Sequence, residues 1–335
     1  MGKNTIKNLV GQPIFKQIIK ILPKAQFDLL VNQLQTDRYY KSFFSWDQLI
    51  VMLFGVFSRC DSMGEVCDGM RALSGKLNYL GMDCSPAKST AGDALRDRSE
   101  ELFKLYYFAL IEYFKPVLSV SRKENVSFSE FYAFDSSTIA LFSDIMKGLG
   151  RNTKGDGKKK GGLKVHMLTD VHSDTPKFVK ISEAKMHDKN FLSYLHPSKG
   201  SMLVFDKAYN FYEQYAQWTE EGVNFVCRLK NNAKYELQEV VFEKVLKKGE
   251  YGVFKVEHIH LEYKKDKQIF PLCLRLVYYK DEKGRKYKFI TNNWDITPEE
   301  VALIYKYRWS IELTFKKNKT KLSASLFLFG YRKRN

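Results

Sequence analysis

The sequence predicts a mixed α/β protein, with a helical N-terminal domain followed by a domain built on a sheet. The first observation is periodicity, because residues 14–118 repeat apolar side chains every three or four positions, as amphipathic helices do. The second is a change near residue 129, where short β-branched and aromatic runs begin to alternate with helix-like stretches. The third is size, since 335 residues with 44% hydrophobic content suffice for two or three domains.

The composition points to a polyanionic partner. The chain carries 55 Lys and Arg against 38 Asp and Glu, a formal net charge of +17, which is typical of proteins that bind nucleic acid. A basic but otherwise ordinary enzyme is the alternative. The five cysteines have no CxxC spacing, so we expect neither a zinc site nor disulfides. The apolar run at 49–57 is too short to span a bilayer, and the N-terminus lacks a secretory signal, so we expect a cytoplasmic protein without a membrane partner.

The N-terminal region is expected to be helical throughout. Residues 85–99 predict a turn that leads into a further helix, to which Lys88, Arg96 and Arg98 give a basic character. A small DNA-binding module and a helical bundle with a charged, solvated end are equally good interpretations of this segment. The four clearest helical stretches read IFKQIIKILP, FDLLVNQL, WDQLIVMLFGVFSR and SEELFKLYYFALIEYF.

The strand-like runs fall into two groups. Charged turns join the runs of the second group. Within the first group, a loop at 147–164 is rich in glycine and basic residues, which suits either solvent or phosphates. Thr297, Pro298 and Glu300 form a capping box that predicts the start of the last helix. The first group reads EFYAFDSSTIAL, GLKVHMLTDVH, KFVKISEAK, SMLVFDKAY and GVNFVCRLK, and the second reads YGVFKVEHIHLEYKK, QIFPLCLRLVYYK and KYKFITNN.

Two acids end buried-looking strands. Asp135 ends the run FYAFD, and Asp206 ends MLVFD. An acid at the C-terminal end of such a strand points into the crevice where α/β sheets bind ligands, and carboxylate oxygens suit Mg²⁺. A strand-end cap is the simpler interpretation of either acid alone, whereas the two together on a basic chain favour a metal site. Asp170, at the end of another strand, is the strongest rival.

The segment YKYRWSIELTFKKNK predicts a helix with a polar line along it. Tyr305, Arg308, Glu312 and Lys319 fall within a sector of roughly 60°, beside an apolar stripe that can pack on a sheet. A third carboxylate from this helix could complete a site for two Mg²⁺ ions. The simpler alternative is a salt bridge of Glu312 with a basic residue four positions away, which would stabilise the helix by only a few tenths of a kcal/mol.

These residues together resemble a known family. The spacing Tyr305-x2-Arg308-x3-Glu312-x6-Lys319 is similar, without a gap, to the Y-R-E-K signature of bacterial insertion-sequence transposases of the "insertion sequence four" family. The acids in FYAFDSSTI and LVFDKAY resemble that family's first two catalytic acids, and GLKVHMLTD and RLKNN resemble its sheet segments. The resemblance covers nearly all of residues 10–319.

The resemblance implies a fold and a chemistry. The fold would be a ribonuclease-H-like mixed sheet with a β-rich insertion and an N-terminal all-helical domain. A DDE triad of Asp135, Asp206 and Glu312 would hold two Mg²⁺ ions, for which Mn²⁺ can substitute, and would cut element ends and join them to a target. The implied parts are a helical domain with possible DNA binding at 1–125, the first part of the catalytic domain at 126–230, the insertion at 231–288, and the last part of the catalytic domain at 289–335.

The implied partner is double-stranded DNA, at both element ends and target, with a homodimer handling two ends together in association with the nucleoid. By the same resemblance Tyr305, Arg308 and Lys319 would contact phosphates, and their chemistry agrees, because Arg offers phosphate a bidentate fork and Lys a point charge. Lys164 and His166, on a strand near the acids, are further candidates for DNA contact.

After Lys319 the sequence departs from the family. It reads FKKNKTKLSASLFLFGYRKRN from Phe315 and stops, which suggests a shifted reading frame or a truncation, either of which would impair activity. Two alternatives to an active transposase therefore stay open. One is a two-metal nuclease that cuts without strand transfer, and the other is a catalytically impaired remnant that only binds element-end DNA.

Overall fold

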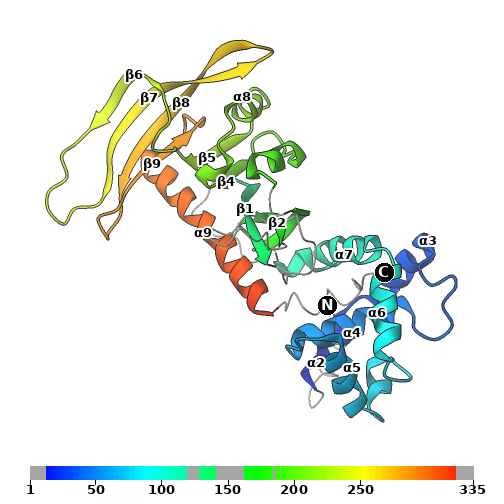
Figure 1. Cartoon of the computed structure of the whole chain (residues 1–335). Coiled ribbons are helices and arrows are strands. Elements are labelled where there is room, and N and C mark those ends of the chain that lie inside the picture. Colours follow the sequence, from blue (N-terminus) through cyan, green and yellow to red (C-terminus); the bar gives the residue numbers. More distant parts are fainter. Residues whose placement is uncertain (1–12, 119–127, 141–161, 184–185, 322–335) are drawn as a thin grey trace, which may run out of the picture. The chain divides into compact units, whose positions relative to one another are not determined.

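A computed structural model of the chain (Figure 1) describes residues 13–118, 128–140, 162–183 and 186–321, apart from the side chains of 118, 139, 140, 162, 310 and 314–321. The chain forms two compact units, one of Met1–Val120 with Lys316–Asn335 and one of Ser121–Phe315. Most of the basic, glycine-rich loop expected at 147–164 and the divergent C-terminus lie outside the described residues. No helix in the described ranges is both long and apolar enough to cross a bilayer.

The N-terminal unit is helical, as the periodicity predicted. Its core is a cluster of buried side chains in which Phe27 makes edge-on ring contacts with Trp46 and Tyr106. Ser62 caps one helix by accepting a hydrogen bond from the Glu65 N–H. The helices are α2 (Ile14–Ile21), α3 (Lys24–Leu34), α4 (Ser45–Phe57), α5 (Met63–Ala72), the 3₁₀ helix η1 (Leu77–Leu80), α6 (Lys88–Asp97) and α7 (Glu101–Leu118).

Two of the basic residues expected to give the α6 region its charge, Arg96 and Arg98, make contacts within the N-terminal unit. The Arg98 side chain is only 2% exposed and donates to Gln48 Oε1 at 2.9 Å and to the Phe43 carbonyl. Arg96 pairs with Asp93 and Asp97, which both belong to its own helix. These contacts favour the helical-bundle interpretation of this segment, and DNA binding by the N-terminal unit stays a prediction.

The second unit is built on a nine-stranded sheet, counted over the described residues, with the order β3-β2-β1-β4-β5-β9-β8-β7-β6. Strand β1 pairs parallel with β4, and β4 pairs parallel with β5, whereas every other pairing is antiparallel. This mixed sheet confirms the predicted fold class, and β3-β2-β1-β4-β5 is its ribonuclease-H-like half. The strands are β1 (Phe131–Ala140), β2 (Gly162–Asp170), β3 (Thr175–Glu183), β4 (Met202–Phe205), β5 (Asn224–Arg228), β6 (Glu236–Glu243), β7 (Gly252–Lys265), β8 (Gln268–Lys280) and β9 (Lys286–Thr291).

Each face of the sheet carries its own apolar cluster because side chains alternate along a strand. On one face Phe134 stacks on Phe205, with ring centroids 4.4 Å apart, and Trp218 of helix α8 (Tyr212–Glu220) packs against them. The short 3₁₀ helices η3 (Asp188–Tyr194) and η4 (Lys207–Tyr209) contribute to the same cluster. On the other face the last helix, α9 (Pro298–Lys321), covers a second cluster (Figure 1).

Helix α9 begins where the sequence predicted. The Thr297 N–H donates to Glu300 Oε2 at 2.7 Å, and the Glu300 N–H donates to Thr297 Oγ1 at 3.2 Å, which is a complete capping box. One stripe of the helix is buried against the sheet, with Val301, Ile304 and Ile311 at most 3% exposed. The cap and this stripe fix the rotation of α9, and with it the direction of the polar side chains beside the stripe.

Candidate active site

Asp206 directly follows β4, as predicted, whereas Asp135 lies in the middle of β1 and does not end its strand, so that part of the prediction is wrong. The two acids nevertheless lie next to each other on neighbouring parallel strands. Phe134 of β1 and Phe205 of β4 are partners in the register, so Asp135 and Asp206, one residue later, occupy equivalent positions on strands about 4.8 Å apart. The residues two positions before each acid belong to the cluster beneath α9. Since side chains repeat on one face every second residue, both carboxylates lie on the face that α9 covers.

Two polar side chains of helix α9 contact these acids, and a third, Glu312, contacts one of the two. Tyr305 Oη donates to Asp206 Oδ1 at 3.3 Å. Arg308 Nη1 lies 3.4 Å from Asp135 Oδ2 and 2.7 Å from Glu312 Oε1. The salt bridge that was the simpler interpretation of Glu312 is therefore present, but the same guanidinium also reaches across to the sheet and links the helix to Asp135.

Burial and like charge shape the electrostatics of this group. The pKa of Asp135 is raised to about 6, mainly by burial and to a lesser degree by the nearby Asp206 and Glu312 carboxylates, although the Ser136 N–H and Arg308 lower it. Burial also raises the pKa of Tyr305, so its hydroxyl stays a donor. For Arg308 burial works against the charge, yet Tyr305, Glu312 and Asp135 together raise its pKa above the usual value. The site therefore holds a buried cation beside Asp135, whose ionisation burial opposes.

The donor set fits divalent cations by its chemistry, because three carboxylates offer the hard oxygen ligands that Mg²⁺ and Mn²⁺ take. Asp135 and Asp206 also fit by position, because the register of β1 and β4 places them side by side. Across the described ranges, however, no three His, Cys, Asp or Glu side chains stand close enough together to hold a metal ion. Glu312 is half exposed and turned to Arg308, so it would have to turn toward the two aspartates to share an ion with them.

Comparison with known proteins decides the family. Residues 127–333, more than half of the chain, match the family described as "Transposase DDE domain". This chain belongs to the DDE transposase family. Residues 10–83 match a second family, described only as a domain of unknown function. The predicted resemblance to insertion-sequence transposases is thereby confirmed.

Three relatives of this DDE transposase chain are themselves named as transposases. A Sinorhizobium fredii protein named "Putative transposase y4zB" is 29% identical over 50% of this chain and 47% of its own length. The transposases for insertion sequence elements IS231E and IS231D of Bacillus thuringiensis subsp. finitimus are 24% and 25% identical, over 82% and 71% of this chain and 66% and 62% of their own lengths. The chain thus spans between about half and two thirds of the length of these relatives.

Two solved structures share a distant likeness. The Mos1 transposase paired-end complex with left transposon end aligns with 64% of this chain and 78% of that one, at 9% identity and a TM-score of 0.22. An endonuclease V from Bacillus subtilis aligns with 67% of this chain and 96% of that one, also at 9% identity, with a TM-score of 0.23. At these TM-scores the two alignments establish nothing further about the fold of the transposase.

The other predicted DNA contacts of the transposase lie elsewhere. Asp135 pairs with Met167 across β1 and β2, so Lys164 and His166 point to the opposite face of the sheet. His166 is fully buried, stacks on Phe191 and contacts Ser182 Oγ at 3.1 Å. In this arrangement neither side chain faces the acids. The Lys319 side chain lies outside the described residues.

Behind Asp135 the transposase has a buried polar network that sequence reasoning missed. Lys164, only 2% exposed, donates from Nζ to the Met186 carbonyl at 2.6 Å and to Asp188 Oδ1 at 3.1 Å. Ser136 Oγ donates to the same Asp188 oxygen at 2.7 Å. Asp188, at the start of η3, is therefore the ion-pair partner of buried Lys164, and its contact with Ser136 links η3 to the residue that follows Asp135. The only signal in the sequence was the small hydroxyl residue that follows Asp135.

The rival acid Asp170 has a structural explanation. Its Oδ1 accepts hydrogen bonds from the His172 and Ser173 N–H groups at 2.8 and 3.2 Å, and its Oδ2 lies 3.8 Å from Lys177 Nζ. These contacts shape the turn between β2 and β3. Asp170 pairs with Tyr132, three positions before Asp135 on β1, and it is a strand-end cap of the kind considered for each acid alone.

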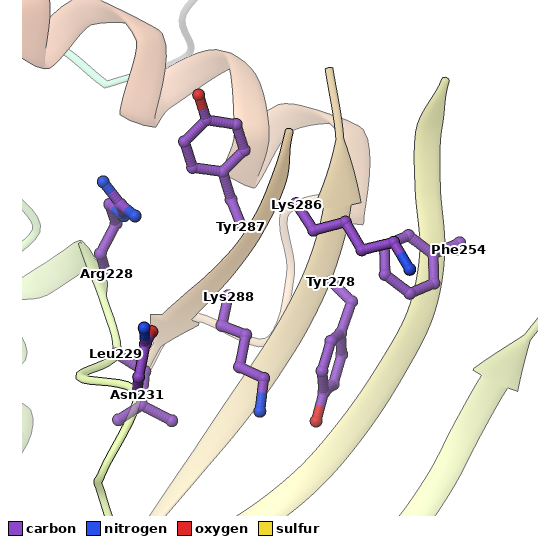
Figure 2. Close-up of a pocket in the computed structure, with 8 residues that line it drawn as sticks. All are labelled: Arg228, Leu229, Asn231, Phe254, Tyr278, Lys286, Tyr287 and Lys288. Carbon is purple, nitrogen blue, oxygen red and sulfur yellow. The ribbon is translucent and has the colours of Figure 1, made fainter. Parts of the chain in front are cut away.

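A basic and aromatic pocket of about 310 Å³ lies where β5 ends on the sheet (Figure 2). Its cations are Arg228, Lys286 and Lys288, none of which pairs with a carboxylate in the part of the chain that is described. Lys288 Nζ lies 5.1 Å from the ring centre of Tyr278, whose hydroxyl donates to Glu257 Oε2 at 2.8 Å. The pocket therefore has unpaired cations beside a ring held in place. Sequence reasoning missed it because its residues come from four strands.

Proposed function

We propose that the chain cleaves the ends of an insertion element and joins them to target DNA with the help of two divalent cations, Mg²⁺ or Mn²⁺. The observation that carries the proposal is the convergence of Asp135 and Asp206, on adjacent parallel strands, with the polar side chains of α9. Two cations held by these aspartates and Glu312 would supply activation of water and stabilisation of the leaving oxygen in phosphodiester displacement.

The chain's own residues orient the ligands. The carboxylates of Asp135 and Asp206 each accept the N–H of the next residue at 2.7 Å, which fixes one oxygen of each. The second oxygen of Asp135 faces Arg308. Tyr305 adds a second donor to Asp206 and joins α9 to β4. Hydrogen bonds to the ionised form of a carboxylate favour that form, which is the one a cation needs.

DNA would be held by cations of the second unit and, as the family resemblance implies, by Lys319. The Arg308 fork suits phosphates at the cleavage site, and the Lys319 ammonium would add a point charge. Lys286 and Lys288, two unpaired cations of the pocket that share one face of β9, suit the phosphates of a strand that runs over that face of the sheet. A homodimer in the DNA complex belongs to the proposal, because two element ends have to be handled together.

The test is a cleavage assay on duplex DNA that carries an element end, scored on a gel for nicks, hairpins and joined products. With Mg²⁺ the unmodified chain should give all three, and with Ca²⁺ we expect binding without cleavage. Asp135→Asn and Asp206→Asn should still bind the DNA. Each should lose more activity than the about 10–100-fold that removal of an outer-shell partner of a metal costs.

Asp170→Asn is the matched control, because it makes the same change at a strand end where an amide can still accept the two backbone N–H groups. This control should cleave like the unmodified chain. Cleavage retained by Asp135→Asn or Asp206→Asn would refute the assignment of the acids. Nicks without joined products would favour the alternative of a two-metal nuclease. Binding without any Mg²⁺-dependent nick would favour a protein that only occupies element ends.

A further inference from the structure

Arg308 and a divalent cation need the same carboxylate oxygens. One nitrogen of its guanidinium, Nη1, contacts both Asp135 Oδ2 and Glu312 Oε1, and both residues are proposed cation ligands. Because both oxygens contact one nitrogen, the guanidinium already sits between two of the three acids. Coordination of an ion by Asp135 Oδ2 together with Glu312 would therefore compete with Arg308.

One N–H donor of the Arg308 guanidinium has no partner within the part of the chain that the structure describes. The side chain is 7% exposed, and its Nε is buried without a hydrogen-bond partner among the described residues. A guanidinium has five N–H donors, and a buried donor left unpaired destabilises the arrangement that contains it. A phosphate would accept two parallel hydrogen bonds from the same fork.

We infer that Arg308 exchanges between the Asp135 and Glu312 carboxylates and a DNA phosphate, and that this exchange makes the binding of divalent cations and of DNA mutually dependent. The inference rests on the proposed function, since it takes the three acids as the cation ligands. While Arg308 holds the acids, a cation has to displace it. Once a phosphate holds Arg308, the carboxylates are free to close on the cation.

The fold permits this exchange without moving α9. Ile304 and Ile311, on either side of Arg308 along the helix, are buried against the sheet at 3% and 0% exposure, so the backbone is fixed and the exchange needs only new side-chain torsions. Linkage requires reciprocity, so a cation must strengthen DNA binding by the same factor by which DNA strengthens cation binding. Coupling of this kind is typically about 5–150-fold.

The experiment measures Mn²⁺ affinity of the full chain by titration calorimetry, with and without a duplex that carries an element end, at a pH where no cleavage occurs within the titration. The unmodified chain should bind Mn²⁺ about 5–150-fold more tightly when DNA is present. Arg308→Met, which keeps a buried unbranched side chain but no charge, should bind Mn²⁺ more tightly than the unmodified chain without DNA and gain little when DNA is added. Lys306→Ala, an exposed cation on the same helix, should behave like the unmodified chain.

A second variant covers the possibility that Arg308→Met folds poorly, which a thermal melt in EDTA would reveal. Arg308→Lys keeps the charge but loses the fork, so it should retain weak Mn²⁺ binding without DNA and lose most of the DNA effect. Equal Mn²⁺ affinity in Arg308→Met and the unmodified chain, or an undiminished DNA effect in both variants, would overturn the inference. Asp135→Asn separates the two levels: if it leaves Mn²⁺ binding unchanged, the proposed function fails, whereas loss of binding there with no effect at Arg308 sinks the inference alone.

Discussion

Replacing Asp135 with Asn is expected to stabilise the folded protein at neutral pH, and the structure gives the size of the effect. The pKa of Asp135 is about 6, against an ordinary value of 3.8, mainly because the carboxylate is buried. Each tenfold change in acid dissociation corresponds to about 1.4 kcal/mol, so the ionised side chain costs the fold about 3 kcal/mol. Its side chain is only 20% exposed, so solvent screening removes little of this. Asn keeps the hydrogen bond from the Ser136 N–H but carries no charge.

The sign of the pH dependence follows from proton binding. Between an ordinary carboxyl pKa near 3.8 and the folded value of about 6, the folded state binds more protons than the unfolded state. The free energy of unfolding contributed by this group therefore falls as pH rises through that window, and the whole cost is present above about pH 6. The advantage of Asp135→Asn should be small at pH 4 and nearly complete at pH 8.

The assay is urea unfolding of both proteins in EDTA at pH 4, 6 and 8. Glu220→Gln, an exposed acid of α8, is the control and should change stability by less than about 0.5 kcal/mol at every pH. An Asp135→Asn protein that is less stable than the unmodified chain at pH 8, or whose advantage does not grow with pH, would refute the electrostatic reasoning. Stability lost to function in this way is common at active sites.

Two other predictions concern the cations of the second unit. The double variant Lys286→Ala with Lys288→Ala should weaken DNA binding, measured by fluorescence anisotropy, and lower the slope of log affinity against log salt by about 1.8, which corresponds to two phosphate contacts on a duplex. The same double change at Lys265 and Lys267, at the other end of the β7–β8 hairpin, is the control and should alter the slope less. Equal slopes for the two pairs would contradict a local site. Lys164→Met should lower the free energy of unfolding by about 3–5 kcal/mol, because it leaves its carboxylate partner in η3 without a cation; a loss below 1 kcal/mol in urea unfolding would show that this ion pair is dispensable.

The fold class and the core of the candidate site could be predicted from the sequence because their signals are local. A buried apolar run that ends in an acid marks Asp135 and Asp206 without any knowledge of pairing. The capping box at Thr297 fixes the start of α9, and the helical repeat puts Tyr305 and Arg308 on one side of it. The parallel register of β1 and β4 then brings the acids together.

The parts that could not be predicted depend on which strands pair and in what register. Lys164 and His166 sit near Asp135 in the sheet, but Asp135 pairs with Met167, and an offset of one residue places a side chain on the other face. Arg98 shows the same limit in the helical unit, because its burial depends on Gln48, fifty residues away along the chain. Sequence patterns give the charge of a residue but not the partner that neutralises it.

The pocket at the end of β5 could not be predicted for the same reason, because it depends on strand pairing. Arg228, Phe254, Tyr278 and Lys286 come from four strands that become neighbours only when β9 pairs with β5 on one side and β8 on the other. No segment of the sequence contains enough of these residues to indicate a site. The second group of strands was therefore recognised as β structure, while its chemistry went unnoticed.

The most direct test of the central claim is anomalous diffraction from crystals of the chain with Mn²⁺ and a duplex that carries an element end. The account expects two Mn²⁺ peaks about 4 Å apart with oxygens of Asp135, Asp206 and Glu312 as protein ligands, and Arg308 turned to a phosphate. Mn²⁺ peaks bound by other residues, or a complex in which Arg308 still bridges Asp135 and Glu312 while the metals lie elsewhere, would contradict it.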